Sequence, residues 1–201
     1  RRNAAEKRFQ YYGIAAIVAG LLMLVILAFN IVTRGVGAFQ QTFITLEVEL
    51  LESKLDKKGN RDLADIKKVT TFGYAPLIKN AVSAAVAQHG IETKLKAKAL
   101  AGILSKSAAA DLRVFVIDNP ERIGDTVEFR FLASSRVDGY LKGRVSRASI
   151  ADDKNISPAQ LDVIDALVAA GVVEKTFNPA FITGADASDQ RPEAAGMGVS
   201  M

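Results

Sequence analysis

The chain has 201 residues, of which 49% are hydrophobic and 24% charged, so it is too apolar for a disordered polymer and long enough for one or two domains. It contains no cysteine, which excludes disulfide frameworks, cysteine-ligated zinc, iron–sulfur clusters and thiol catalysis. The formal charge is +4, but the excess lies at the N-terminus, where Arg1, Arg2, Lys7 and Arg8 outnumber one acid. From Gly35 onward acids and bases balance, which does not indicate a nucleic-acid-binding surface.

The segment after these basic residues predicts a transmembrane helix. No formal charge occurs between Arg8 and Arg34, and only an asparagine is strongly polar from Gly13 to Val32. A helix of about 20 apolar residues spans the roughly 30 Å hydrocarbon core of a bilayer. Tyr11 and Tyr12 lie where an interfacial aromatic belt is expected.

Two other interpretations of this segment fit less well. A buried core helix usually has a polar stripe, whereas this segment is apolar on all sides. A cleavable signal peptide has an apolar stretch of about 7 to 15 residues, and the stretch before a cleavage-like Val36-Gly37-Ala38 is longer. The four basic residues before the helix and the one after it predict a cytoplasmic N-terminus, with the rest of the chain on the other side of the membrane.

The predicted fold class is α+β, with one N-terminal transmembrane helix followed by a periplasmic domain of mixed helices and strands. The predicted divisions are a basic cytoplasmic N-terminus at residues 1–10, the transmembrane helix at 11–33, the α+β domain at 39–184 and a linker at 185–201. No second hydrophobic stretch of spanning length follows the first in this sequence.

Three segments of the domain have the alternation of half-buried strands. The first runs from Thr42 to Leu50. The clearest runs from Thr126 to Ala133, where aromatic and aliphatic residues alternate with charged ones. The last runs from Val172 to Phe177, with Phe181–Thr183 as a further strand segment.

Helices are predicted between and after these strands, following a solvated loop at Leu51–Asn60 that has at most a turn of helix. Asn60 or Asp62 begins a helix that breaks near Pro76, and Pro76 begins a second helix that ends at His89-Gly90. Further helices are predicted over Glu92–Ser105, Ser107–Asp118, Ser135–Gly143, and from a Ser157-Pro158-Ala159-Gln160 capping box to Gly171.

Few residues carry recognisable chemistry. The single histidine, His89, is expected to interact with a helix C-terminus rather than to act as a base or ligand. Gly35-Val36-Gly37 lacks the rest of a phosphate-binding loop, and no nucleophile-elbow motif occurs. The remaining candidates are two acidic pairs, Asp152-Asp153 and Asp162 with Asp165, and a basic cluster of Lys142, Arg144 and Arg147.

Adjacent surface acids are usually solvated, and the basic cluster is interpreted as an exposed face rather than an anion site. The sequence therefore predicts no catalytic, cofactor-binding or metal-binding residue, no cofactor, and a protein that is not an enzyme.

Short motifs are distributed over nearly the whole chain. They are Ala4-Ala5-Glu6-Lys7-Arg8-Phe9, Gly37-Ala38-Phe39-Gln40-Gln41-Thr42, Asp118-Asn119-Pro120 with Ile123-Gly124, Phe131-Leu132-Ala133-Ser134 with Val137-Asp138, Phe177-Asn178 through Phe181 to Thr183, and Arg191-Pro192-Glu193-Ala194-Ala195-Gly196. Their order and spacing resemble the N-terminal extension of certain bacterial phosphate ABC-transporter permeases, the PstA-type subunits.

The resemblance implies a subunit of an ATP-driven phosphate importer in the bacterial inner membrane, multi-pass in its full length. The implied partners are a second permease subunit, a cytoplasmic ATPase subunit that would hydrolyse ATP, a periplasmic phosphate-binding protein and the lipid bilayer, without nucleic acid. The permease core is absent from these residues, so no transport residue can be assigned. We expect an N-terminal fragment whose last residues approach a second membrane helix, and whose outer domain is an accessory or docking module.

The alternative is a single-pass, membrane-anchored periplasmic domain that acts as a sensor or scaffold. It shares the helix, the orientation and the α+β domain with the permease interpretation. The two differ after Met201, where a permease continues into further membrane helices and an anchored domain ends. A membrane-tethered enzyme is a third interpretation, which the lack of a convergent acid–base or metal set disfavours.

Overall fold

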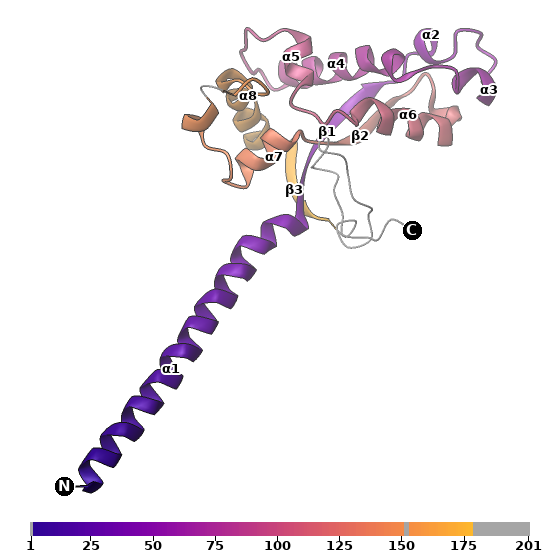
Figure 1. Ribbon diagram of the computed structural model, residues 1–201. Coiled ribbons are helices and arrows are strands. Elements are labelled where there is room, and N and C mark those ends of the chain that lie inside the picture. Colours follow the sequence, from indigo (N-terminus) through magenta and orange to yellow (C-terminus); the bar gives the residue numbers. More distant parts are fainter. Residues whose placement is uncertain (1, 151–152, 179–201) are drawn as a thin grey trace. The chain divides into compact units, whose positions relative to one another are not determined.

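The computed structural model describes residues 2–150 and 153–178, which fall into two compact units that divide between Phe39 and Gln40. The first unit consists of helix α1 (Arg2–Gly35) and a 3-10 turn, η1 (Val36–Phe39). The second unit is the α+β domain (Figure 1).

Helix α1 is long and apolar enough to cross a membrane. Its stretch Gln10–Thr33 has a mean hydropathy of 2.8, and none of it is buried against the protein. The polar groups of this stretch bond within the helix: Asn30 Nδ2 donates to the carbonyl of Ile26 at 3.1 Å, and Thr33 Oγ1 donates to that of Phe29 at 2.8 Å. Such back-bonding satisfies polar side chains where no water is present. The predicted apolar helix is confirmed, and its orientation stays a prediction.

The domain is built on a three-stranded antiparallel sheet in the order β2-β1-β3. Its strands are β1 (Gln40–Glu49), β2 (Thr126–Leu132) and β3 (Val173–Phe177), so the first strand of the chain is the central one. Ile44 pairs with Phe131 on one side and with Val173 on the other. The three predicted strands are confirmed, while the strand segment predicted at Phe181–Thr183 lies outside the described residues.

Helices and turns occupy the connections, which confirms the predicted α+β class. They are α2 (Glu52–Leu55), α3 (Leu63–Ile66), α4 (Thr71–Gln88), α5 (Ala97–Ala101), α6 (Ala108–Asp118), η2 (Pro120–Arg122), α7 (Ser135–Leu141), η3 (Arg147–Ile150) and α8 (Pro158–Ala169). The predicted capping box is present at α8, where Ser157 and Gln160 bond to each other's backbone amides.

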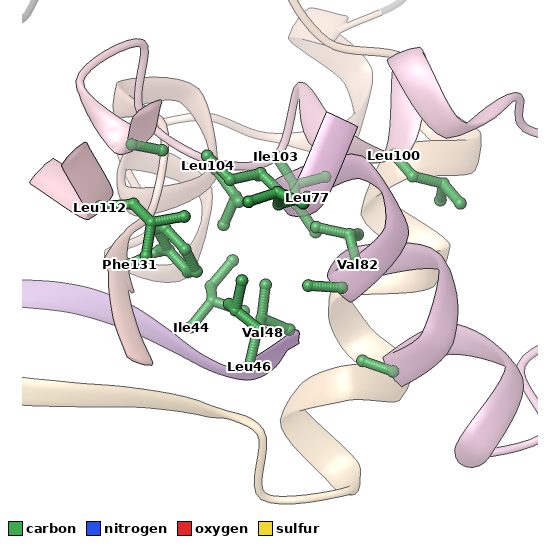
Figure 2. Packing of buried hydrophobic residues seen from close by; sticks show 14 of the residues in the cluster. Ile44, Leu46, Val48, Leu77, Val82, Leu100, Ile103, Leu104, Leu112 and Phe131 are labelled. Carbon is green, nitrogen blue, oxygen red and sulfur yellow. The ribbon is translucent and has the colours of Figure 1, made fainter. Parts of the chain in front are cut away.

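The core lies between one face of the sheet and the helices, with α4 as its main cover. Ile44, Leu46 and Val48 alternate along β1 and are 2% exposed or less. Figure 2 shows them beneath Leu77 and Val82, which α4 contributes. The intervening β1 residues lie on the opposite face, where Glu47 and Glu49 are exposed. This period-two burial is what the sequence alternation predicts.

The predicted break at Pro76 is wrong, because α4 continues through this proline. Pro76 is the sixth residue of the helix, so its missing amide leaves only the carbonyl of Phe72 without its helical partner. Phe72 is 86% exposed, so water can reach this region of the helix. The chain breaks earlier, before Thr71, after a short α3 that Asp62 caps by accepting from the amide of Ala64 at 2.9 Å.

The helix predicted over Glu92–Ser105 is also largely wrong, since only α5 within it is helical. Ile91, Thr93 and Leu95 are half-buried and alternate with exposed neighbours, a period of two that requires an extended backbone. The hydroxyl of Thr93 accepts from the amide of Leu95 at 3.2 Å, a local bond that competes with helix formation.

Ser107 precedes α6 as predicted, but its side chain does not cap the helix. The hydroxyl instead donates to Asp111 Oδ2 at 2.7 Å. The predicted position of Ser107 before the helix is therefore correct. The predicted bond from its side chain to the helix backbone is absent, and a bond to the Asp111 side chain takes its place.

Replacing Tyr74 by phenylalanine is expected to raise the free energy of unfolding by about 1 kcal/mol. Tyr74 is fully buried in α4, and its hydroxyl has no hydrogen-bond partner within residues 2–150 and 153–178. Burial raises the pKa of this hydroxyl, and Arg113 opposes the shift. The folded state therefore retains the proton while the unfolded state releases it above about pH 10, so stability falls as the pH rises through that range.

Urea unfolding of the full chain in detergent, at pH 7 and at alkaline pH, measures both effects. The Phe variant should lose less stability at alkaline pH than the parent does, because Lys58, whose pKa Asp65 raises, still contributes to the loss. Tyr140→Phe is the matched control, because the hydroxyl of Tyr140 donates to Asp165 Oδ2 at 3.0 Å and its removal should be slightly destabilising. A Tyr74→Phe variant that is less stable than the parent would contradict the expectation.

Candidate functional site

The acidic and basic residues singled out by the sequence meet on α7, η3 and α8. Arg147 donates through Nη1 to Asp162 Oδ1 at 2.7 Å and through Nη2 to Asp165 Oδ2. Its Nε donates to the hydroxyl of Tyr140 at 3.2 Å, and that hydroxyl donates to Asp165. The bonds to Asp162, and then those to Asp165, raise the pKa of the Arg147 guanidinium. One arginine thus holds the acidic pair.

The other two basic residues converge on Asp138 of α7. Lys142 Nζ lies 2.7 Å and Arg144 Nη2 3.0 Å from Asp138 Oδ2. The other carboxylate oxygen of Asp138 accepts from Thr42 Oγ1 at 2.9 Å, and Lys142 also donates to the carbonyl of Gln40. The side chains of Asp138 and Lys142 are 10% and 8% exposed, so this group is a nearly buried ion pair.

This buried group, which we call the Asp138 node, ties α7 to the first residues of β1. Thr42 is fully buried, and Gln40 begins the strand. Sequence analysis singled out Lys142 and Arg144 but missed Asp138 and Thr42. The spacing of Asp138 and Lys142, four residues apart in a predicted helix, is the available signal for their pairing, and nothing in the sequence indicates Thr42.

The remaining acidic candidate is also paired. Arg136 Nε lies 3.1 Å from Asp153 Oδ2 in an ion pair, and the Asp153 side chain is 10% exposed. Its neighbour Asp152 lies outside the described residues. Within the part of the chain that the structure describes, no three residues among the histidines, aspartates and glutamates group as metal ligands would. The candidate charges therefore build ion pairs between elements.

His89 lies at the C-terminal cap of α4, as the sequence predicts. Its amide donates to the carbonyl of Ala85 at 3.1 Å, and Gly90 follows with a φ of +63°. A residue in this left-handed conformation ends the helix, which favours glycine. Gly35-Val36-Gly37 falls at the junction of α1 and η1.

Helix α1 carries an extended surface of exposed apolar side chains. The leucines, isoleucines and valines of this helix are about half exposed or more along its length. Ile14, near the start of the stretch, is 58% exposed, and Val32, near its end, is 61% exposed. Tyr11 and Tyr12, at 72% and 74%, precede them. A continuous apolar surface of this size is stable in a bilayer or against another apolar surface rather than in water.

A family model described as "Domain of unknown function (DUF3333)" matches residues 1–151. No curated protein and no solved structure matches the chain. The matched range covers α1, β1, β2 and α7 and stops short of α8 and β3. Because β3 pairs with β1, residues beyond the matched range complete the same sheet.

Proposed function

The chain belongs to the DUF3333 family, and we propose that it is the N-terminal, membrane-anchored part of the permease subunit of an ATP-driven phosphate importer. In this proposal α1 is the first membrane span of a PstA-type subunit. The α+β domain lies in the periplasm as an accessory or docking module. ATP hydrolysis takes place on a separate cytoplasmic subunit.

The observation that carries the anchoring role is the junction of the two units. Helix α1 is apolar over Gln10–Thr33, and the chain passes through one 3-10 turn directly into β1, the central strand of the domain. Strand β1 is hydrogen-bonded on both sides, so the segment that directly follows the anchor is part of the sheet. This connection suits a domain held at a membrane surface rather than one on a long linker.

The orientation is supported by the charges that flank α1. Basic residues concentrate before the helix, at Arg1, Arg2, Lys7 and Arg8, and positively charged flanks remain on the cytoplasmic side during insertion. The domain then lies outside the cytoplasm. A chain without cysteine functions equally well in that oxidising compartment.

The phosphate-importer part of the proposal is supported by the motif order that resembles PstA-type permeases, from the basic N-terminal segment to Arg191-Pro192. The docking role is supported by the charge network of the domain. The acids and bases Arg147, Asp162 and Asp165 form ion pairs between η3 and α8, which stabilise the fold of a binding module.

Deleting residues 40–177 from the gene, with a flexible linker in their place, is expected to reduce phosphate uptake by cells at limiting phosphate. The protein should stay in the membrane fraction, because α1 is retained. Uptake of radiolabelled phosphate and co-purification of the periplasmic binding protein are the measurements. Unchanged uptake together with unchanged co-purification would overturn the accessory role.

Orientation is tested in the same cells by labelling single introduced cysteines, since these 201 residues contain none. A Lys98→Cys variant, on exposed α5, should react with a membrane-impermeant maleimide in intact spheroplasts, and an Arg2→Cys variant should react only after lysis. The reverse pattern would contradict a periplasmic domain.

The second candidate function is a single-pass anchored sensor or scaffold, which the continuity of α1 with the domain equally supports. It predicts that phosphate uptake is independent of this gene. Deleting the whole gene separates the two: loss of uptake favours the permease, and normal uptake with a changed signalling or assembly phenotype favours the anchored domain.

A further inference from the structure

At one end of the domain, four lysines line a pocket. Figure 1 shows α2 and α3 at this end, away from α7 and α8. The pocket has a volume of about 420 Å³ and lies beside the start of α4. Buried Leu55 and half-buried Val69 contribute to its walls, and exposed Lys54, Lys57, Lys58 and Lys68 surround them.

The lysines leave an excess of positive charge at this end. Lys58 and Lys68 lie 2.8 and 2.7 Å from the carboxylate of Asp65, which holds the pKa of that carboxyl well below its usual range. Lys54 and Lys57 have no ion pair among the described residues. Two aspartates, Asp65 and the buried Asp56, line the pocket against four lysines, so the net charge is positive.

An aromatic side chain projects next to this pocket. Phe72 follows the pocket residue Thr70 by two positions and precedes the pocket residue Gly73. At 86% exposed it is the most exposed large hydrophobic residue of the described part of the domain. An exposed aromatic ring among lysines is the composition that proteins use at the headgroup level of a membrane.

The exposed charges on the outer face of the sheet are mostly acidic, with the base Arg130 among them. On the outer face of the sheet, Glu47 lies directly opposite Glu128, and Glu49 and Glu174 are exposed on the same face. None of these four glutamates has an ion pair among the residues that the structure describes. Charges of opposite sign on different faces orient a domain over a charged surface.

We propose that the α2–α4 end docks on the anionic headgroups of the membrane in which α1 is embedded, with Phe72 entering the interface and the lysines contacting lipid phosphates. This inference rests on the membrane anchoring proposed above. Strand β1 has ten residues, about 33 Å, so the far end of the sheet stays within that distance of the anchored end. Because α1 tethers the domain, the effective concentration of the docking end at the membrane surface is high. Each lysine near anionic headgroups strengthens the attraction between the domain and the membrane.

The test uses the full chain with single spin labels, since the protein has no cysteine of its own. A label at Thr71→Cys reports on the docking end and leaves Phe72 in place. A label at Val168→Cys, on α8, is the control within the domain, and a label at Leu24→Cys reports on α1. Each protein is reconstituted into vesicles of phosphatidylcholine alone and into vesicles containing about one third phosphatidylglycerol. The measurement is the accessibility of each label to lipid-soluble oxygen and to a water-soluble nickel complex.

We expect the label at position 71 to move from water into the lipid interface only when phosphatidylglycerol is present, and the label at 168 to remain in water throughout. Replacing both Lys54 and Lys57 by glutamate should reduce the docked population roughly thirtyfold or more. The same exchange at Lys94 and Lys98, which are exposed elsewhere, should have little effect. Phe72→Asp should also release the docked state.

Position 71 remaining in water in both kinds of vesicle would overturn the inference and leave the anchoring intact, provided the label at Leu24 lies in lipid. Equal lipid contact in both vesicles, unaffected by the lysine exchange, would overturn the assignment to anionic headgroups. A label at Leu24 that remains in water would overturn the proposed anchoring and this inference together.

Discussion

Replacing Asp138 by asparagine is expected to lower the free energy of unfolding of the domain by about 3 kcal/mol. The carboxylate lies 2.7 Å from Lys142 Nζ, and both side chains are at most 10% exposed. Without the negative charge, the Lys142 ammonium remains nearly buried with only the carbonyl of Gln40 and a neutral amide as partners. Arg144 is 63% exposed and can turn into water, so the loss falls mainly on Lys142. Urea unfolding of the full chain in detergent, followed by circular dichroism, measures the change.

Two controls distinguish the stability lost because a buried charge is left unpaired from the stability lost because an ion pair is broken. Asp162→Asn breaks a 2.7 Å pair with Arg147 whose side chains are 67% and 48% exposed, so it should cost less than about 1 kcal/mol. Combining Asp138→Asn with Lys142→Met removes both buried charges and should restore most of the stability. Equal losses for Asp138→Asn and Asp162→Asn would show that burial of the Asp138 node does not matter.

Replacing the three central leucines of α1, Leu21, Leu22 and Leu24, by arginine is expected to prevent insertion of the helix. Each arginine near the centre of a spanning helix adds about 3 kcal/mol to the insertion free energy, so the three together add about 9 kcal/mol. The wild-type chain should resist extraction from membranes by alkaline carbonate, and the triple variant should be recovered as soluble or aggregated protein.

The matched control places alanine at the same three positions, which shortens the side chains without adding charge and should leave the protein in the membrane. Arginine at Gln10 and Tyr11, near the end of the apolar stretch, should also be tolerated because long side chains reach the headgroups from there. A triple arginine variant that stays membrane-integral would show that α1 is not a membrane span.

The parts of the fold that the sequence predicts correctly are those fixed by local composition. Helix α1 follows from an uncharged apolar run, and β2 follows from alternating Val127, Phe129 and Phe131. The capping box at Ser157 begins α8 because both partner residues lie within one turn of helix. None of these features needs knowledge of a distant part of the chain.

The errors occur where packing overrides a local signal. Pro76 is a helix breaker in isolation, yet Leu77, Ile78 and Val82 are buried on the same helix and their burial outweighs one lost bond near an exposed end. Residues 91–96 have helix-compatible composition, but Ile91 and Leu95 pack on the core from an extended backbone.

The ion pairs of the candidate site also depend on packing between distant parts of the chain, which the sequence alone does not reveal. Arg147 appeared in the sequence as part of a basic cluster and Asp162 as part of an acidic one, and their partnership depends on how η3 and α8 pack. Thr42 and Asp138 are brought together only because β1 lies beside α7. Charges that look available in a sequence are often already matched by a residue from another element.

The position of β1 in the sheet has a consequence for biogenesis. It is the first of the described strands to leave the ribosome, yet its neighbours are β2, far along the chain, and β3, the last strand among the described residues, whose Phe177 pairs with Gln40. Until both arrive, the apolar row of Ile44, Leu46 and Val48 is uncovered, although α1 is already complete. Such distant pairing is slow, and unpaired strands are prone to aggregate while they wait. We therefore expect holding chaperones to reduce aggregation of the newly made protein between the synthesis of β1 and that of β3.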